Sequence, residues 1–310
     1  MLLVEQNEGS LQMGDIKAKV IAHSINEEGV ELISIETIAP KFLDAEIEKH
    51  RMFSSNSSSD RAIPFHKMRE KPIFIPEDVR LNEKGMQGYS NLEGEELQLF
   101  REDMKELYLY TLSVLGKWGH VHKQHLNRYL LGYSIQTKVI TANKEWWDYF
   151  IGLRKAEGAD PAIQSLTKCV DISLEGSSPI ELGVDDWHLA YYEGGVWTKE
   201  EGIPLKVALD RSVAACARTS YSNHDGTRVE NKKDGELAER LLRDGHFSCF
   251  EHQATPMQTS VRCNRNYLTE QGFYLGEEQG ATHIDRNQDL WSANFKGWVQ
   301  YRQLVQQKEG

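Results

Sequence analysis

The chain has 310 residues, of which 39% are hydrophobic and 27% charged, and its formal net charge is -11. These shares are typical of globular proteins and exclude fibrous and intrinsically disordered classes. The negative charge argues against a broad nucleic-acid surface, because clustered Lys and Arg bind phosphate backbones, but it is compatible with a small basic pocket. No apolar run approaches the roughly 20 residues that span a bilayer, and the N-terminus lacks the basic start of a signal peptide. We therefore expect a cytoplasmic protein without membrane or nucleic-acid partners.

The first predicted element is a β-hairpin. Residues 18–39 contain two β-branched runs on either side of the turn Asn-Glu-Glu-Gly, which predicts strand, turn and strand. Pro40 suits the first turn of a helix, because its missing N–H would have no partner there. A short helix is therefore predicted after the hairpin, with His50 and Arg51 at its end. The serine-rich run that follows is predicted to be a loop.

Helices dominate the prediction for the next part of the chain. Residues 102–116 repeat apolar side chains with helical spacing, which predicts one helix. Residues 126–166 predict a helix that breaks at Gly132, followed by a second that begins near Asn143 and continues beyond Arg154.

The second half begins with an irregular stretch. Residues 170–205 are rich in Gly and acidic residues and show no clear period, which indicates an insertion or a hinge. A helix of small residues is predicted for 206–223. Asp234 then caps a further helix, and Gly245 ends it.

One segment combines basic residues with many hydroxyl groups. The sequence contains neither GxxxxGK[ST] nor GxGxxG, so side chains would have to hold a nucleotide. Residues 48–64, EKHRMFSSNSSSDRAIP, offer Ser hydroxyls and Arg61, whose guanidinium can bind two phosphate oxygens. A solvated surface loop is the alternative interpretation of the same residues.

Two other clusters also allow more than one interpretation. His120, His122 and His125 lie within six residues, which suggests a metal hydrolase, but no HExxH motif or paired acidic ligand accompanies them. Residues 244–252 predict either a self-capped helix end or a polar rim on an aromatic floor. Cys249 is interpreted as structural, because the sequence contains no CxxC pair and nothing that shows the lowered pKa of a nucleophilic thiol.

Four segments together resemble the flavin-dependent thymidylate synthases. The family signature is Arg-His-Arg followed by seven residues, then Ser, any residue and Arg. Three other family motifs accompany it. They are a His-Gly-His-x-Thr-Pro-Phe-Glu-His segment, an Ala-Ala-Arg-x-Ser segment, and an Asn that lies eleven positions before an Arg. The matching residues are Lys49-His50-Arg51 with Ser59 and Arg61, residues 244–252, residues 217–220, and Asn143 with Arg154. These segments cover roughly half of the chain.

The resemblance implies the fold and the assembly. It implies an α+β fold with a mixed, largely antiparallel sheet covered by helices. The order of the segments implies that the chain is circularly permuted and carries insertions, like the long forms found in some phages. For a phage-encoded protein, the location would be the host cytoplasm. The first half would comprise 1–169, a connecting insertion 170–209 and the second half 210–310, in one composite catalytic domain. A homotetramer with shared active sites is also implied.

The resemblance implies reductive methylation of dUMP. Methylenetetrahydrofolate would give the carbon, FAD would carry the hydride, and NADPH would be the reductant. Arg154 would stabilise negative charge on the uracil ring. The implied substrate-binding residues are Ser57, Ser58, Ser59, Arg61, Arg128 and Arg154. The implied cofactor-binding residues are Lys49, His50, Arg51, Asn143, Ser220, His246, Ser248 and Glu251.

Several positions depart from the family pattern. Lys49 stands in place of an Arg, Glu46 in place of a Gln, Ser57 in place of an acid and Glu145 in place of an Arg. A protein that binds the nucleotide but has lost catalysis is therefore the alternative hypothesis. Two residues near the C-terminus could supply a missing partner, namely Gln300 and Arg302.

Overall fold

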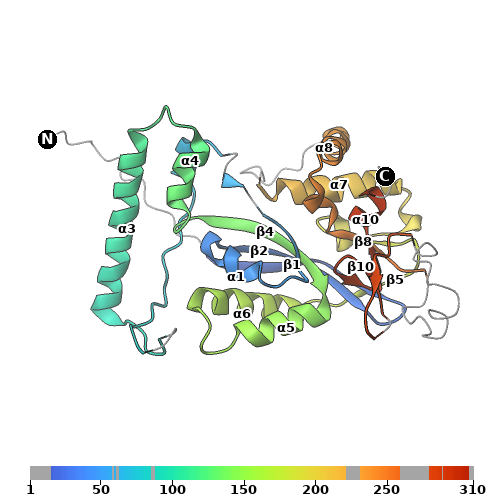
Figure 1. The fold of residues 1–310 in the computed structure, drawn as a ribbon, viewed down its shortest axis with the longest axis horizontal. Helices are drawn as coiled ribbons and strands as arrows, with labels where there is room; N and C mark the ends of the chain where they lie inside the picture. Colours follow the sequence, from blue (N-terminus) through green and yellow to red (C-terminus); the bar gives the residue numbers. More distant parts are fainter. Residues whose placement is uncertain are drawn as a thin grey trace.

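The computed structural model describes residues 15–57, 59–60, 63–84, 88–220, 231–258, 279–287 and 289–306 (Figure 1). The strands are β1 (Lys17–Asn26), β2 (Glu31–Pro40), β3 (Ser54–Ser57), β4 (Ile135–Asn143), β5 (Ile180–Leu182), β6 (Trp187–Leu189), β7 (Val196–Trp197), β8 (Gln253–Pro256), β9 (His283–Ile284), β10 (Leu290–Ser292), β11 (Phe295–Lys296) and β12 (Trp298–Gln300). The α-helices are α1 (Asp44–Ile47), α2 (Phe65–Met68), α3 (Gly94–Gly116), α4 (Lys123–Asn127), α5 (Lys144–Arg154), α6 (Pro161–Glu175), α7 (Leu205–Ala217), α8 (Asn231–Arg243) and α10 (Tyr301–Gln306). The 3-10 helices are η1 (Lys41–Leu43), η3 (Arg128–Leu130), η4 (Glu193–Gly195), η5 (Lys199–Glu201), η6 (Arg218–Ser220) and η7 (Phe247–Phe250). Within the described ranges, no helix combines the length and the apolar character needed to cross a membrane.

The predicted hairpin is confirmed. β1 and β2 pair antiparallel, and the turn between them is closed by Asn26, whose side-chain oxygen accepts hydrogen bonds from the N–H groups of Glu28 (3.1 Å) and Val30 (2.9 Å). Gly29 adopts φ +78°, a conformation that costs little only without a side chain. The turn residues thus account for the tight reversal of the chain.

The central sheet is mixed and largely antiparallel, as expected. Its order is β3-β4-β2-β1-β5, and only the β1–β5 pair is parallel. Two predictions need correction: the serine run was expected as a loop but forms β3, and helix was expected before Asn143 where β4 lies. The β-branched residues Val139, Ile140 and Thr141 suit a pleated strand, and β4 gains partners on both sides, β2 and β3.

β4 presents opposite faces to two cores. Val139 packs with residues of α7, α8 and η7, while Ile140 packs against α5 and α6. This follows from the strand period, which turns successive side chains to opposite faces of a sheet. In Figure 1, α5 and α6 lie along one side of the central sheet, and α7, α8 and α10 gather at one end of it. The central sheet therefore holds both halves of the chain together.

The stretch 170–205, predicted as an insertion or hinge, takes part in two sheets. β5 extends the central sheet beside β1, and β6 pairs with β8 in a four-stranded sheet of order β12-β8-β6-β7. A third sheet has the order β11-β10-β9. The division at 169 and 209 stays a prediction, and the segment between these points pairs with both halves.

The remaining helices lie near the predicted positions, but several bounds differ: α1 ends at Ile47, before His50 and Arg51, and α5 ends at Arg154 instead of continuing beyond it. The helix expected over 102–116 begins earlier, at Gly94, and the small-residue helix corresponds to α7. α8 begins at Asn231, so Asp234 lies in its first turn instead of capping it. There the Asp234 carboxylate pairs with the Arg218 guanidinium at 2.6 Å and joins α8 to η6.

A buried chain of hydrogen bonds crosses from the central sheet to the four-stranded sheet. Ser24 Oγ contacts His188 Nδ1 at 2.9 Å, and Ser34 Oγ contacts His188 Nε2 at 2.8 Å. Ser34 also bonds to Thr141 at 2.6 Å, and Thr141 bonds to His252 Nδ1 at 2.9 Å. Burial lowers the pKa of both histidines to about 3, so both are neutral at pH 7.

These histidines predict a loss of stability in acid. Their folded-state pKa lies below the unfolded value, so the stabilisation is present above about pH 6.5 and declines as the pH falls toward 3. Between pH 7 and pH 5, each should lower the free energy of unfolding by about 2 kcal/mol. Urea unfolding at both pH values measures this, and His252→Gln should remove about half of the difference. An unchanged pH dependence in this variant would contradict the assignment.

Candidate active site

The ends of α1 and α5 meet at Arg154. Its Nε donates to His50 Nε2 at 3.2 Å, its NH1 donates to Glu46 Oε2 at 2.6 Å, and its NH2 donates to the Glu46 carbonyl at 3.2 Å. The Arg154 side chain is 15% exposed. Two residues that the resemblance implied, His50 and Arg154, are thus in direct contact, and Glu46, one of the departures from the family pattern, holds the guanidinium in place.

His50 lies among aromatic rings. Its ring stacks on Phe53 with centroids 5.5 Å apart and meets the edges of Phe150 at 5.0 Å and Tyr149 at 5.9 Å. Burial, and then the charge of Arg154, lower the pKa of His50. A neutral imidazole agrees with the hydrogen bond, because Nε2 can accept from Arg154 only when it carries no proton.

The serine strand β3 joins the two halves of the chain. Asn56 Nδ2 donates to the carbonyl of Cys216 at 2.7 Å, and Ser248 Oγ donates to Asn56 Oδ1 at 3.1 Å. Cys216 directly precedes the segment 217–220. The Asn56 side chain therefore links two of the segments that carry the family resemblance, 49–61 and 244–252, and the residue that directly precedes a third.

The C-terminal part of the described chain adds a further contact to this region. Gln300 Nε2 donates to Ser54 Oγ at 3.2 Å and to the carbonyl of Glu251 at 3.4 Å. Arg302 pairs with the Glu251 carboxylate, and its guanidinium lies 5.6 Å from the centre of the Phe247 ring. These two residues were singled out in the sequence only as possible partners, and the structure places them beside the predicted cofactor residues Ser248 and Glu251.

Arg128 lies next to an anchor of the serine-rich segment. Asn127 Nδ2 donates to the carbonyls of Asp60 at 2.7 Å and Ile63 at 2.9 Å. Lys41 pairs with the Asp60 carboxylate at 2.7 Å. Arg128 itself is exposed at the start of η3. Its predicted place near the substrate is therefore compatible with the path of the chain.

Asn143 makes contacts away from this cluster. Its Oδ1 accepts from the N–H of Lys296 at 2.9 Å, and its Nδ2 donates to the carbonyl of Lys296 at 3.1 Å and of Glu31 at 3.3 Å. Lys296 Nζ in turn lies 3.4 Å from the carboxylate of Glu145. The amide of Asn143 thus ties β11 to β2 and β4, and its predicted contact with FAD stays a prediction.

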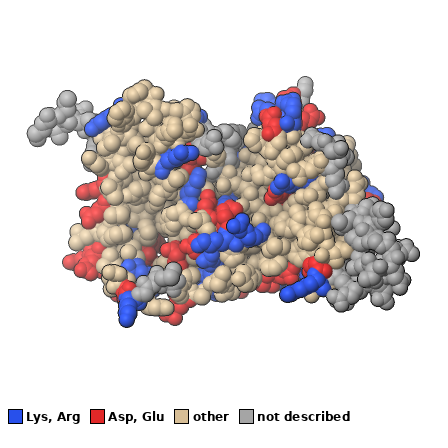
Figure 2. Space-filling view, viewed as in Figure 1, with Lys and Arg blue, Asp and Glu red and all other residues tan. Residues whose placement is uncertain are grey.

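The remaining predicted residues differ in how far the structure places them. Ser58 and Arg61 lie outside the described residues, as does the side chain of Ser220. The exposed ones are Lys49, Arg51, Ser59, His246 and Ser248; Ser57 and Glu251 are half-buried. Figure 2 shows basic and acidic side chains close together near the middle of this face, over α1.

The cysteines have the character of core thiols. Burial raises the pKa of Cys249 to about 11 and of Cys216 well above its ordinary value. Burial also raises the pKa of Cys169. A thiol with a raised pKa is a poor nucleophile, so the three described cysteines fit a structural role; Cys263 lies outside the described residues.

The histidine cluster has local contacts. His122 Nδ1 accepts from the N–H of Gln124 at 3.3 Å and caps α4. His125 Nε2 lies 3.4 Å from the side-chain nitrogen of Gln124. In the part of the chain that the structure describes, no three His, Cys, Asp or Glu side chains gather as metal ligands.

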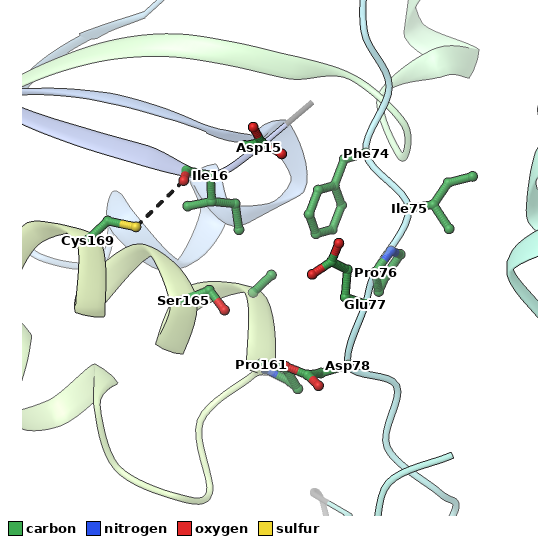
Figure 3. A pocket seen from close by; sticks show the side chains of 11 residues that line it. Asp15, Ile16, Phe74, Ile75, Pro76, Glu77, Asp78, Pro161, Ser165 and Cys169 are labelled. Atoms are coloured by element: carbon green, nitrogen blue, oxygen red, sulfur yellow. Dashed lines mark hydrogen bonds between the residues drawn. The ribbon is translucent and has the colours of Figure 1, made fainter. Parts of the chain in front are cut away.

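A cavity of about 270 Å³ lies elsewhere, between α6 and the extended segment 74–78 (Figure 3). Its lining includes the carboxylates of Asp15, Glu77 and Asp78 next to Phe74. These charges would repel a phosphate group, so the cavity does not compete with the cluster around Arg154 as a nucleotide site.

Residues 24–177, about half of the chain, match the family model described as thymidylate synthase complementing protein. The chain belongs to this family. No curated protein matches its sequence. The match spans β1 to α6 and therefore includes the contact between His50 and Arg154.

Several solved structures resemble parts of this member of the family. The structure of the UMP/dUMP methylase PolB from Streptomyces cacaoi bound with 5-Br UMP is 14% identical in sequence to this chain. Its TM-score is 0.43, and the alignment covers 53% of this chain and 91% of that chain. The structure of the same enzyme bound with 5-Br dUMP is 13% identical. Its TM-score is 0.45, and the alignment covers 54% of this chain and 93% of that chain. The flavin dependent thymidylate synthase ThyX from Helicobacter pylori, complexed with FAD and dUMP, is 15% identical, with a TM-score of 0.33 over 47% and 69%.

The Asn56 bridge predicts a specific stability effect. Asn56→Ala removes both hydrogen bonds and leaves the Cys216 carbonyl without this donor, which should lower the free energy of unfolding by about 1–3 kcal/mol. Ser55→Ala in the same strand removes only a bond to exposed Glu48 and should change it by less than about 0.5 kcal/mol. Urea unfolding of both variants measures the difference, and equal effects would contradict the bridge.

Proposed function

We propose that the chain is a flavin-dependent thymidylate synthase that converts dUMP to dTMP. The methylene carbon of methylenetetrahydrofolate would form a bond to uracil C5 while its two bonds to the folate nitrogens break and tetrahydrofolate leaves, and the C5 proton would be released. Reduced FAD, when bound, would supply the hydride that makes the transferred carbon a methyl group. NADPH as the reductant and a homotetramer with shared sites belong to the same proposal.

One observation carries the proposal beyond the family match. Residues that are remote in sequence converge: His50 contacts Arg154, and Asn56 contacts both Cys216 and Ser248. A nucleotide site without a glycine-rich phosphate loop needs this kind of convergence, because its donors must come from side chains.

Arg154 is suited to stabilise charge on the pyrimidine. Of its five N–H groups, three donate to His50 and Glu46, which leaves one on NH1 and one on NH2 for a ligand. A guanidinium held by three bonds needs little reorganisation when negative charge develops on a ring oxygen. Glu46 fixes the position of the guanidinium through two of these bonds.

The exposed residues around His50 fit FAD. The cofactor carries a pyrophosphate and a flat ring system, so it needs cationic donors and an aromatic or apolar surface. Lys49 and Arg51 are exposed on either side of His50, and Ser248 offers an exposed hydroxyl. The rings of Phe53 and Tyr149 lie beside His50. This set of donors and rings supports binding of the phosphates and the ring system in one region.

The proposal predicts the effect of removing the guanidinium fork. Arg154→Lys keeps the charge but cannot bond to Glu46 and a ligand in the same geometry. We expect retained flavin absorbance and a kcat for dTMP formation lower by about 10²-fold or more. The assay contains dUMP, methylenetetrahydrofolate and NADPH, with NADH as a separate arm, and dTMP is quantified by chromatography.

Lys155→Ala provides the matched control. Lys155 follows Arg154 directly but pairs with Asp171 of α6 at 2.5 Å on the surface, so its removal should leave turnover nearly unchanged. Turnover in Arg154→Lys equal to that of the unsubstituted protein would remove Arg154 from the mechanism. Binding of FAD and dUMP without any dTMP in the unsubstituted protein would instead support the binding-protein alternative.

A further inference from the structure

Helix α3 exposes an apolar stripe in addition to the one it buries. Its buried stripe, with Tyr108, Leu112 and Leu115, packs against the helix that follows and the segment around Ile73. Leu107 is nevertheless 49% exposed and Tyr110 69% exposed. Figure 1 shows α3 standing at one edge of the molecule. A helix whose apolar surface extends beyond its own core has a second face available for contact.

The exposed stripe has regular spacing. Successive members are three or four residues apart, which keeps them on one side of a helix. They are Glu96, Phe100, Asp103, Leu107, Tyr110, Val114 and Lys117. Phe100 and Val114 are half-buried and the others are exposed. In the described part of the chain, Glu96, Asp103 and Lys117 make no ion pair with one another or with any other residue, so their charges are available to a partner.

The stripe is complementary to itself when reversed about Leu107. Phe100 and Val114 each lie seven residues from Leu107, so reversal places these two apolar residues opposite each other. The same reversal places the Glu96 carboxylate near the Lys117 ammonium. Such self-complementarity is the property of a twofold symmetric interface, in which residue i contacts residue j and j contacts i.

We propose that two copies of this chain associate through an antiparallel pair of α3 helices, with the twofold axis beside Leu107. The helix has 23 residues and is therefore about 34 Å long, enough for several layers of side chains to meet. Asp103 of each copy lies opposite Tyr110 of the partner, and a phenol can donate to a carboxylate.

Other arrangements of the same stripe fit worse. A parallel pair would place Glu96 against its own copy, and Asp103 likewise, which brings like charges together. A shift of the antiparallel register by one step would set Asp103 against Val114 and Phe100 against Lys117, leaving charges on apolar surface. Figure 2 shows acidic side chains along the edge of the molecule where α3 lies. Glu93, Glu95 and Glu96 lie at the start of this helix, whereas Lys117 follows its end, so antiparallel packing brings opposite charges together.

A disulfide at the twofold axis tests the interface. Leu107→Cys should form a cross-linked dimer under mild oxidation, because two copies of one residue at a twofold axis between packed helices come within disulfide reach. Leu153→Cys, an exposed position on α5 (46% exposed), is the matched control and should give no more dimer than the unsubstituted protein. Non-reducing gels measure both. Absence of cross-linked Leu107→Cys above that background would overturn the proposal.

Charge reversal tests the antiparallel orientation. Glu96→Lys and Lys117→Glu should each weaken self-association by about tenfold in analytical ultracentrifugation, since each change acts twice in a symmetric dimer. The double variant should recover the dissociation constant to within about threefold. Single reversals without effect, or a double variant as weak as the singles, would overturn the orientation. These measurements use the protein without ligands and do not depend on the proposed reaction, so either hypothesis can fail without the other.

Discussion

The pairing of β3 with β4 is the constraint on which the candidate site depends. A strand of only four residues, three of them serines, gains its position from hydrogen bonds to β4 between Thr141 and Lys138. That pairing presents Asn56 to Cys216 and Ser248. It also brings Ser54 to Gln300 near the C-terminus. Without β4 beside it in the sheet, the serine run would have no fixed position relative to the second half of the chain.

β4 itself is stable because both of its faces are covered. Its neighbours β2 and β3 satisfy the backbone, while α5 and α6 cover one face and the second half of the chain covers the other. On the second face, the hydroxyls of Ser34 and Thr141 bond to His188 and His252, while Nε2 of His252 has no partner among the described residues. Removal of one member of a buried hydrogen-bond chain leaves its neighbour without a partner and lowers the stability of the fold, whereas the paired members favour one packing arrangement. These hydrogen bonds help to explain why the central sheet and the four-stranded sheet pack in one relative position.

The electrostatics of the site follow from the same packing. Arg154 ends α5 with its charge paired by Glu46, and His50 stays neutral because burial and the nearby guanidinium both oppose its protonation. The site therefore combines one fixed cation, one neutral imidazole and exposed Lys and Arg residues nearby. This arrangement suits an anionic nucleotide in a protein whose overall charge is negative. Self-association through α3 involves a different edge of the molecule and would leave these groups in place.

The sequence by itself determined the hairpin 18–39, the presence but not the end of the short helix after it, and the residue types of the site, because turn residues, β-branched runs and short motifs act locally. It did not reveal β4 or β3. A buried strand beside a helix has no distinguishing period, and a run of serines becomes a strand only when a neighbour supplies hydrogen bonds. The contacts of Arg154 with Glu46 and of Arg302 with Glu251 were decided by the tertiary structure alone. Those residues lie far apart in the chain, and only the folded sheet brings their side chains within bonding distance.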